Sequence, residues 1–92
     1  MLRLNVFISV EDVNRAQVLD AAKELTAASV MEDGCIAYDI FESATRTSVL
    51  LICETWKDSE TLAAHEVSAS FIKNIAILKE LTKYIKIEKF EF

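Results

Sequence analysis

The segment Ser48–Trp56, SVLLICETW, is apolar on both of its faces. Side chains alternate along an extended strand, so Val49 and Leu51 share one face while Leu50 and Ile52 share the other. A strand of this kind belongs inside a sheet that is covered on both sides. The fold must therefore supply two separate covers for this one strand.

The segments on either side of it predict the rest of a small α+β domain. Residues 2–10 alternate, with an aliphatic row on one face and Arg3, Asn5, Phe7 and Ser9 on the other, which is typical of a strand. A helix is predicted from residue 12 to about residue 31, with Gly34 at or just past its end. Residues 35–42, CIAYDIFE, form the next predicted strand.

Two helical segments and a final strand follow the central strand. Asp58 or Ser59 is expected to cap a short helix that runs to about residue 67. After a polar break, Phe71, Ile75 and Leu78 have the spacing of a second helical segment. Residues 84–92, YIKIEKFEF, alternate again and predict the last strand.

The order β-α-β-β-α-β predicts a ferredoxin-like fold for residues 1–92, which form a single domain. Right-handed crossovers give a four-stranded antiparallel sheet with its helices on one face. The opposite face is then bare although it is apolar, and such a patch usually marks an interface. We therefore predict a homodimer in which two sheets pack face to face.

Composition excludes several functional classes. The net charge is −5 and no basic face is visible, which argues against nucleic-acid binding. No apolar run is long enough to cross a membrane and no signal peptide is visible, so we expect a cytoplasmic protein. One glycine and one histidine exclude a phosphate loop, a dinucleotide fingerprint and any site with paired imidazoles. Cys35 and Cys53 are expected to be reduced thiols, although a bridge between neighbouring strands stays open.

Three stretches resemble the antibiotic biosynthesis monooxygenase domain: EDGCIAYDIFES, ETWKDSETLAAH and SASF. Their order and spacing fit that family from Leu2 to Phe92. The resemblance implies a dimeric α+β barrel, in agreement with the fold predicted from the strand pattern. SASF departs from the pattern because it lacks the second histidine that many relatives have there.

The resemblance implies a range of activities rather than one. Some relatives are cofactor-independent monooxygenases of phenols and quinols, whereas others degrade haem or process the autoinducer-2 signalling sugar. Haem degradation is disfavoured, since FIKNIAILKEL (residues 71–81) offers no histidine as an axial ligand. Fold analogy alone does not choose among the remaining activities.

His65 and Asn5 are the predicted catalytic residues. Histidine titrates near neutrality when unperturbed, so His65 is the natural general base, and the resemblance places a pocket histidine there. The resemblance also places Asn5 near an asparagine of the haem-degrading relatives, and its amide could stabilise a substrate anion. Both also have purely structural interpretations. If both are catalytic, they must converge on one cavity.

Seven further residues are predicted to contact the substrate, namely Arg3, Phe7, Tyr38, Phe41, Glu54, Trp56 and Phe71. Trp56, at the end of a strand, is expected mainly to pack. Glu54 is a surface acid, a partner for Arg3, or an anion that holds a base in place. Two of the four residues Phe7, Tyr38, Phe41 and Phe71 are expected to fill the core.

The sequence therefore predicts a cofactor-independent monooxygenase of a small quinol-like or phenolic compound, with O₂ as co-substrate and no bound metal. One alternative is an enzyme that processes a metabolite of the autoinducer-2 type, and against it Arg3 is the only anion partner expected at the cavity. Another is a non-catalytic, stress-responsive dimer that binds a small ligand and depends on neither His65 nor Asn5.

Overall fold

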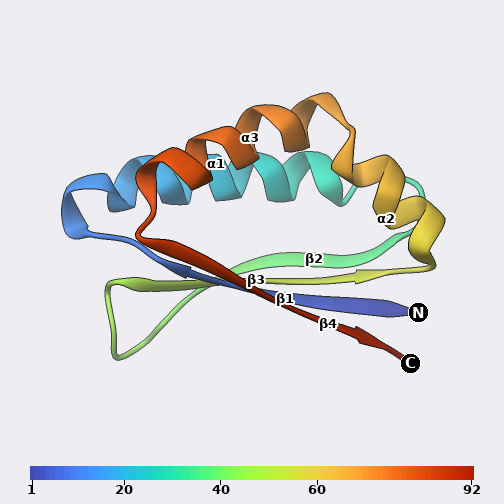
Figure 1. Cartoon of the computed structure of the whole chain (residues 1–92), viewed down its shortest axis with the longest axis horizontal. Coiled ribbons are helices and arrows are strands. Elements are labelled where there is room, and N and C mark those ends of the chain that lie inside the picture. Colours follow the sequence, from blue (N-terminus) through green and yellow to red (C-terminus); the bar gives the residue numbers. More distant parts are fainter.

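The computed structural model describes all 92 residues, and its helices lie together over one face of a four-stranded sheet (Figure 1). The elements in chain order are β1 (Leu2–Ser9), α1 (Asp12–Ser29), β2 (Cys35–Glu42), β3 (Val49–Trp56), α2 (Ser59–Glu66), α3 (Ala69–Leu81) and β4 (Tyr84–Glu91). This arrangement confirms the ferredoxin-like α+β prediction, including the break between the two C-terminal helices.

The strands are ordered β2-β3-β1-β4, and each neighbouring pair is antiparallel. The doubly apolar strand β3 is therefore internal, as its sequence predicts. In the β1–β3 register Leu2 lies opposite Trp56 and Ile8 lies opposite Leu50. The two chain ends meet at one end of the β1–β4 pair, where the Phe92 N–H donates to the Met1 carbonyl at 2.9 Å (Figure 1).

The core lies between the helices and the face of the sheet that carries the aliphatic row of β1. Leu4, Val6 and Ile8 of that row are buried there, together with Val18 and Leu25 of α1. The apolar stripe of α1 that contains these two residues is therefore its inner face. None of the helices is long and apolar enough to span a bilayer.

The other face of the sheet has no cover within the chain, and we call it the open face. It carries Phe7 of β1, Phe41 of β2 and Leu51 of β3, which line a shallow hollow together with Val49. Phe41 is 49% exposed. One of the two covers that β3 requires is thus provided by the helices, and the second is not provided by this chain.

Local sequence signals determine where the two C-terminal helices begin. Asp58 caps α2, since its carboxylate accepts from the Thr61 N–H at 2.8 Å, and Oγ1 of Thr61 accepts from the Asp58 N–H. Ser68 caps α3 through the Phe71 N–H. The polar break between the helices is therefore a start signal for α3.

Gly34 does not lie at the end of α1, which corrects the prediction made from its sequence position. The helix ends at Ser29 with a right-handed C-cap at Val30. Gly34 has φ +80 in the turn before β2, and a Cβ placed there would lie 2.3 Å from Cγ2 of Thr61. Glycine is needed because the turn is left-handed and touches α2.

Candidate active site

A cavity of about 60 Å³ lies between the sheet and the helices. Its wall is mostly apolar and is formed by Leu4, Val6, Leu25, Tyr38, Ile52, Glu54, Leu62, His65, Glu66, Phe71, Ile75, Leu78 and Ile87. An apolar cavity that binds benzene in another protein has a volume of about 150 Å³, so this space is too small for an aromatic ring. A ligand with an aromatic ring can enter only if part of this wall moves outward.

His65, the only histidine, lines this cavity from α2. Its side chain is 1% exposed. Three aromatic rings surround the imidazole: Trp56 at 4.5 Å, Phe71 at 5.0 Å and Tyr38 at 5.7 Å between ring centroids. The ring is therefore held by packing on several sides.

The one hydrogen bond of the His65 imidazole goes to Glu32, a residue that was not predicted from the sequence. Oε1 of Glu32 lies 2.6 Å from Nδ1 of His65, and Nε2 has no hydrogen-bond partner in the chain. Glu32 belongs to the turn that connects α1 to β2, 33 positions before His65. The available signal was the glycine that follows two residues later, since it marks a tight turn that can bring a side chain against a neighbouring element.

Glu54 is the second polar group of the cavity wall and is only 4% exposed. Its Oε1 accepts a hydrogen bond from Nε1 of Trp56 at 2.9 Å. Burial raises the pKa of the Glu54 carboxyl, although the Trp56 bond and the nearby His65 act in the opposite direction. Burial and the Glu54 charge also raise the pKa of Tyr38, which keeps its phenol protonated. Glu54 in its neutral form can donate a hydrogen bond to a ligand oxygen.

Trp56 lies behind His65 rather than in the cavity wall. It is fully buried, packs against the imidazole and donates to Glu54. This agrees with the expectation that Trp56 mainly packs. The indole of Trp56 therefore positions two side chains that line the cavity, the imidazole of His65 and the carboxyl group of Glu54.

The predicted site residues divide between the two faces of the sheet. Tyr38, Glu54, His65 and Phe71 line the cavity, with Trp56 behind them. Tyr38 and Phe71 belong to the core or pack against it, which gives the two core aromatics expected. The remaining four, Arg3, Asn5, Phe7 and Phe41, lie on the open face.

The expected convergence of Asn5 and His65 is therefore wrong, and one of the three alternatives for Glu54 is excluded. Asn5 lies opposite Cys53, on the face away from the cavity, so it does not converge with His65. Arg3 does not pair with Glu54, because the antiparallel register places it opposite Thr55, to which its Nε donates at 3.1 Å. In both cases alternation along the strand places the two partners on opposite sides of the sheet. A catalytic role for Asn5 alone stays a prediction.

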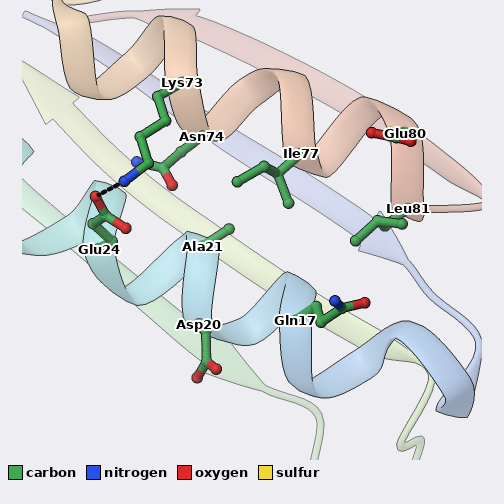
Figure 2. A pocket seen from close by; sticks show the side chains of 9 residues that line it. All are labelled: Gln17, Asp20, Ala21, Glu24, Lys73, Asn74, Ile77, Glu80 and Leu81. Carbon is green, nitrogen blue, oxygen red and sulfur yellow. Dashed lines mark hydrogen bonds and ion pairs between the residues drawn. The ribbon is translucent and has the colours of Figure 1, made fainter.

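A larger hollow lies elsewhere, in the open groove between α1 and α3 (Figure 2). Figure 2 shows Lys73 reaching across it to Glu24, with which it forms an ion pair of 2.8 Å. Beside this pair, Oδ1 of the buried Asn74 has no hydrogen-bond partner. None of the predicted site residues lies in this groove.

No group of three or more histidine, cysteine or acidic side chains is placed to hold a metal ion. Cys35 and Cys53 are free thiols. Burial, together with the charges of Glu54 and Glu32, raises the pKa of the Cys35 thiol and so disfavours its reactive thiolate form.

Comparison with known proteins identifies the same family over most of the chain. The antibiotic biosynthesis monooxygenase family matches residues 1–76. The Bacillus subtilis (strain 168) protein named "Putative monooxygenase YcnE" is 32% identical over 81 residues, which cover 88% of this chain and 85% of that protein.

Solved structures give the same result for the fold. A conserved protein from Bacteroides thetaiotaomicron is 56% identical with a TM-score of 0.96, covering 99% of this chain and 96% of its own. A Deinococcus radiodurans protein described as a "putative antibiotic biosynthesis monooxygenase" is 24% identical with a TM-score of 0.93, covering 100% of this chain and 92% of its own. At 24% identity, the similarity to the Deinococcus radiodurans structure supports the fold alone.

Proposed function

Because the chain belongs to the antibiotic biosynthesis monooxygenase family, we propose that it oxidises a small phenolic or quinol-like compound with O₂ and without a bound cofactor. The family and the related protein named as a monooxygenase support a monooxygenase-like function in general. The substrate class is our proposal. The observation that carries it is the apolar cavity with one buried imidazole in its wall.

The proposed reaction begins with proton transfer to His65. Nε2 takes the hydroxyl proton of the bound phenol, and the resulting anion is electron-rich enough to pass an electron to O₂. The ring carbon gains one oxygen atom as a carbonyl and loses its hydrogen, while the second oxygen atom leaves as water. One O₂ accounts for both oxygen atoms, so the substrate supplies all the electrons and no external reductant is required.

The cavity argues against a phosphorylated metabolite as the substrate. Its wall contains two glutamates and no lysine or arginine, and Arg3 lies on the opposite face of the sheet. A phosphate group buried there would have no cationic partner, which is costly. An uncharged ring with one or two hydroxyl groups fits the apolar wall and the few polar groups better.

Oxygen uptake with a panel of phenols and quinols tests this proposal. Loss of a general base reduces rates by about 10²–10⁴-fold, and His65→Gln should show a loss on that scale. Asp33→Ala, at an exposed turn residue, should retain the wild-type rate within about twofold, the scale of a surface substitution. Equal rates in His65→Gln and wild type would remove the base role from His65. Binding of the panel without oxygen uptake would instead favour a ligand-binding protein.

A further inference from the structure

Glu32 is the one group in the chain that binds the imidazole of His65. The Oε1–Nδ1 distance is 2.6 Å, and the side chain of Glu32 is 27% exposed whereas that of His65 is 1% exposed. Other polar groups face the same region: Glu54 from β3, Tyr38 from β2 and the neighbouring Glu66 on α2. None of these forms a hydrogen bond with the ring. The contact with Glu32 is therefore the one polar interaction that fixes the orientation of the imidazole.

The backbone places Glu32 with little freedom. Its N–H donates to Ser29 at 3.0 Å, and its carbonyl accepts from the Cys35 N–H at 3.2 Å. The same turn is anchored where the Gly34 carbonyl accepts from the Lys57 N–H at 2.8 Å. The backbone from which the Glu32 side chain extends is therefore fixed, as a preorganised partner requires.

The turn follows one side of α2. Gly34 packs against Thr61, and Glu32 bonds His65, which lies four residues after Thr61. Residues four apart lie on the same helix face, so the two contacts align the turn with α2. The position of Glu32 relative to the imidazole thus depends on the spacing of Thr61 and His65 along α2 and on the close contact that Gly34 allows.

A carboxylate at Nδ1 determines which ring nitrogen carries the proton. Neutral imidazole has one N–H donor and one acceptor nitrogen, and a bond from Nδ1–H to a carboxylate fixes the proton on Nδ1. Nε2, which has no partner in the chain, then keeps its lone pair. This is the nitrogen that a base at the cavity must use.

We propose that Glu32 is the positioning residue of His65, and this inference rests on the function proposed above. Glu32 holds the Nδ1–H tautomer and stabilises the imidazolium that forms when Nε2 takes the phenol proton. In that step the phenol O–H bond breaks and an Nε2–H bond forms. The proton is later returned to the reduced oxygen that leaves as water, so Glu32 itself neither gains nor loses a proton.

The tautomer can be measured without any substrate. His65 is the only histidine, so its ¹⁵N ring signals in the NMR spectrum need no assignment by mutation. At pH 8 the wild type should be mainly the Nδ1–H tautomer. Glu32→Ala should shift the ring mainly to the Nε2–H form, which free imidazole side chains prefer. Asp33→Ala is the matched control, since Asp33 is exposed in the same turn, and it should leave the wild-type signals unchanged.

Kinetics form the second arm of the experiment. For any substrate found in the panel, Glu32→Ala should lower kcat by roughly 10- to 100-fold, the scale of partners that orient a functional histidine. KM should stay within about threefold, and Glu32→Gln, which keeps an acceptor oxygen, should recover part of the loss. Asp33→Ala should match the wild type in both constants.

The two arms separate this inference from the proposed function. An unchanged tautomer in Glu32→Ala would overturn the positioning role, whatever the activity. A shifted tautomer, with no oxygen uptake in the wild type for any phenol or quinol, would leave the positioning role in place and overturn the proposed function. A shifted tautomer with unchanged kcat would also overturn the inference as stated, because the orientation of His65 would then not affect the reaction.

Discussion

Among the cavity residues, Glu54 is the one whose burial lowers the stability of the folded protein. It is buried beside Tyr38, and burial raises its pKa. Between its ordinary value and the raised value, the folded protein binds more protons than the unfolded chain does. The free energy of unfolding contributed by Glu54 therefore falls as pH rises through this window and stays reduced above it. A destabilising group of this kind is typical of a functional site.

Replacement of Glu54 by glutamine should therefore stabilise the protein at pH 8. Glutamine keeps an oxygen that accepts the bond from Trp56 and carries no charge at any pH. A gain of about 1 kcal/mol raises the melting temperature of a domain of this size by about 4–8 °C. The gain should disappear toward pH 4, where the wild-type carboxyl is protonated as well. Melting curves from pH 4 to 8 measure this, with the exposed Glu80→Gln as the control; a pH-independent difference would contradict the explanation.

At the scale of elements, the turn between α1 and β2 is the most constrained connection in the chain. Gly34→Ala would place a methyl group 2.3 Å from Cγ2 of Thr61, in a backbone conformation with φ +80. The left-handed conformation alone costs about 1–2 kcal/mol for alanine. With the steric conflict added, we expect a loss of about 2–4 kcal/mol in the free energy of unfolding.

Urea denaturation checks this prediction for the turn. Asp33→Ala in the same turn is the comparison, and its effect should stay within about 0.5 kcal/mol. The ¹⁵N signals of His65 should also change in Gly34→Ala, since Glu32 moves with the turn. An alanine variant as stable as the wild type would show that α2 can shift to accommodate the methyl group.

The elements themselves could be predicted from the sequence because each depends on local patterns. Alternation predicted β1 and β4, and the capping signals at Asp58 and Ser68 mark the starts of α2 and α3. The faces were harder to assign. Tyr38 and Phe41 are three residues apart on β2 and must point to opposite faces, but the pattern does not say which face the helices cover.

Site residues could be found from the sequence where a local pattern identifies them, but not where their identification depends on which face of the sheet is covered. His65 could be identified because it is the only histidine and lies on a helix whose apolar residues mark the side that faces the core. Asn5 was paired with His65 incorrectly, because the pairing requires knowing which side chains of β1 point toward the helices. Glu32 was not identified, since a glutamate in a turn is ordinary until its tertiary neighbour is known. Local sequence patterns thus predict the helices and strands and indicate single candidate residues, whereas tertiary packing determines which of these residues meet at one site.

At the scale of the whole molecule, the open face leads to a prediction about assembly. Phe7, Phe41, Val49 and Leu51 lie there without a cover, and β3 needs one on that side. We expect two copies to pair through this face, with a mass twice the 10.4 kDa of the chain. Leu51→Lys should shift the protein toward the monomer, because it would bury a charge without a partner.

Light scattering coupled to size-exclusion chromatography measures this mass at micromolar concentration. Ala76→Lys adds the same charge on the exposed side of α3 and should leave the dimer intact. A monomeric wild type, or a dimer that is disrupted only by the α3 variant, would contradict pairing through the open face.

The small volume of the cavity has a consequence for how ligands are bound. A space of about 60 Å³ cannot hold an aromatic ring, so the protein must first adopt a conformation in which part of the cavity wall, such as Phe71, has moved outward. If this open form is a fraction f of the molecules, the apparent dissociation constant is the intrinsic one divided by f. Selectivity among substrates then depends on which of them best stabilises the open form, and a variant with a smaller side chain at position 71 should bind more ligands and discriminate less.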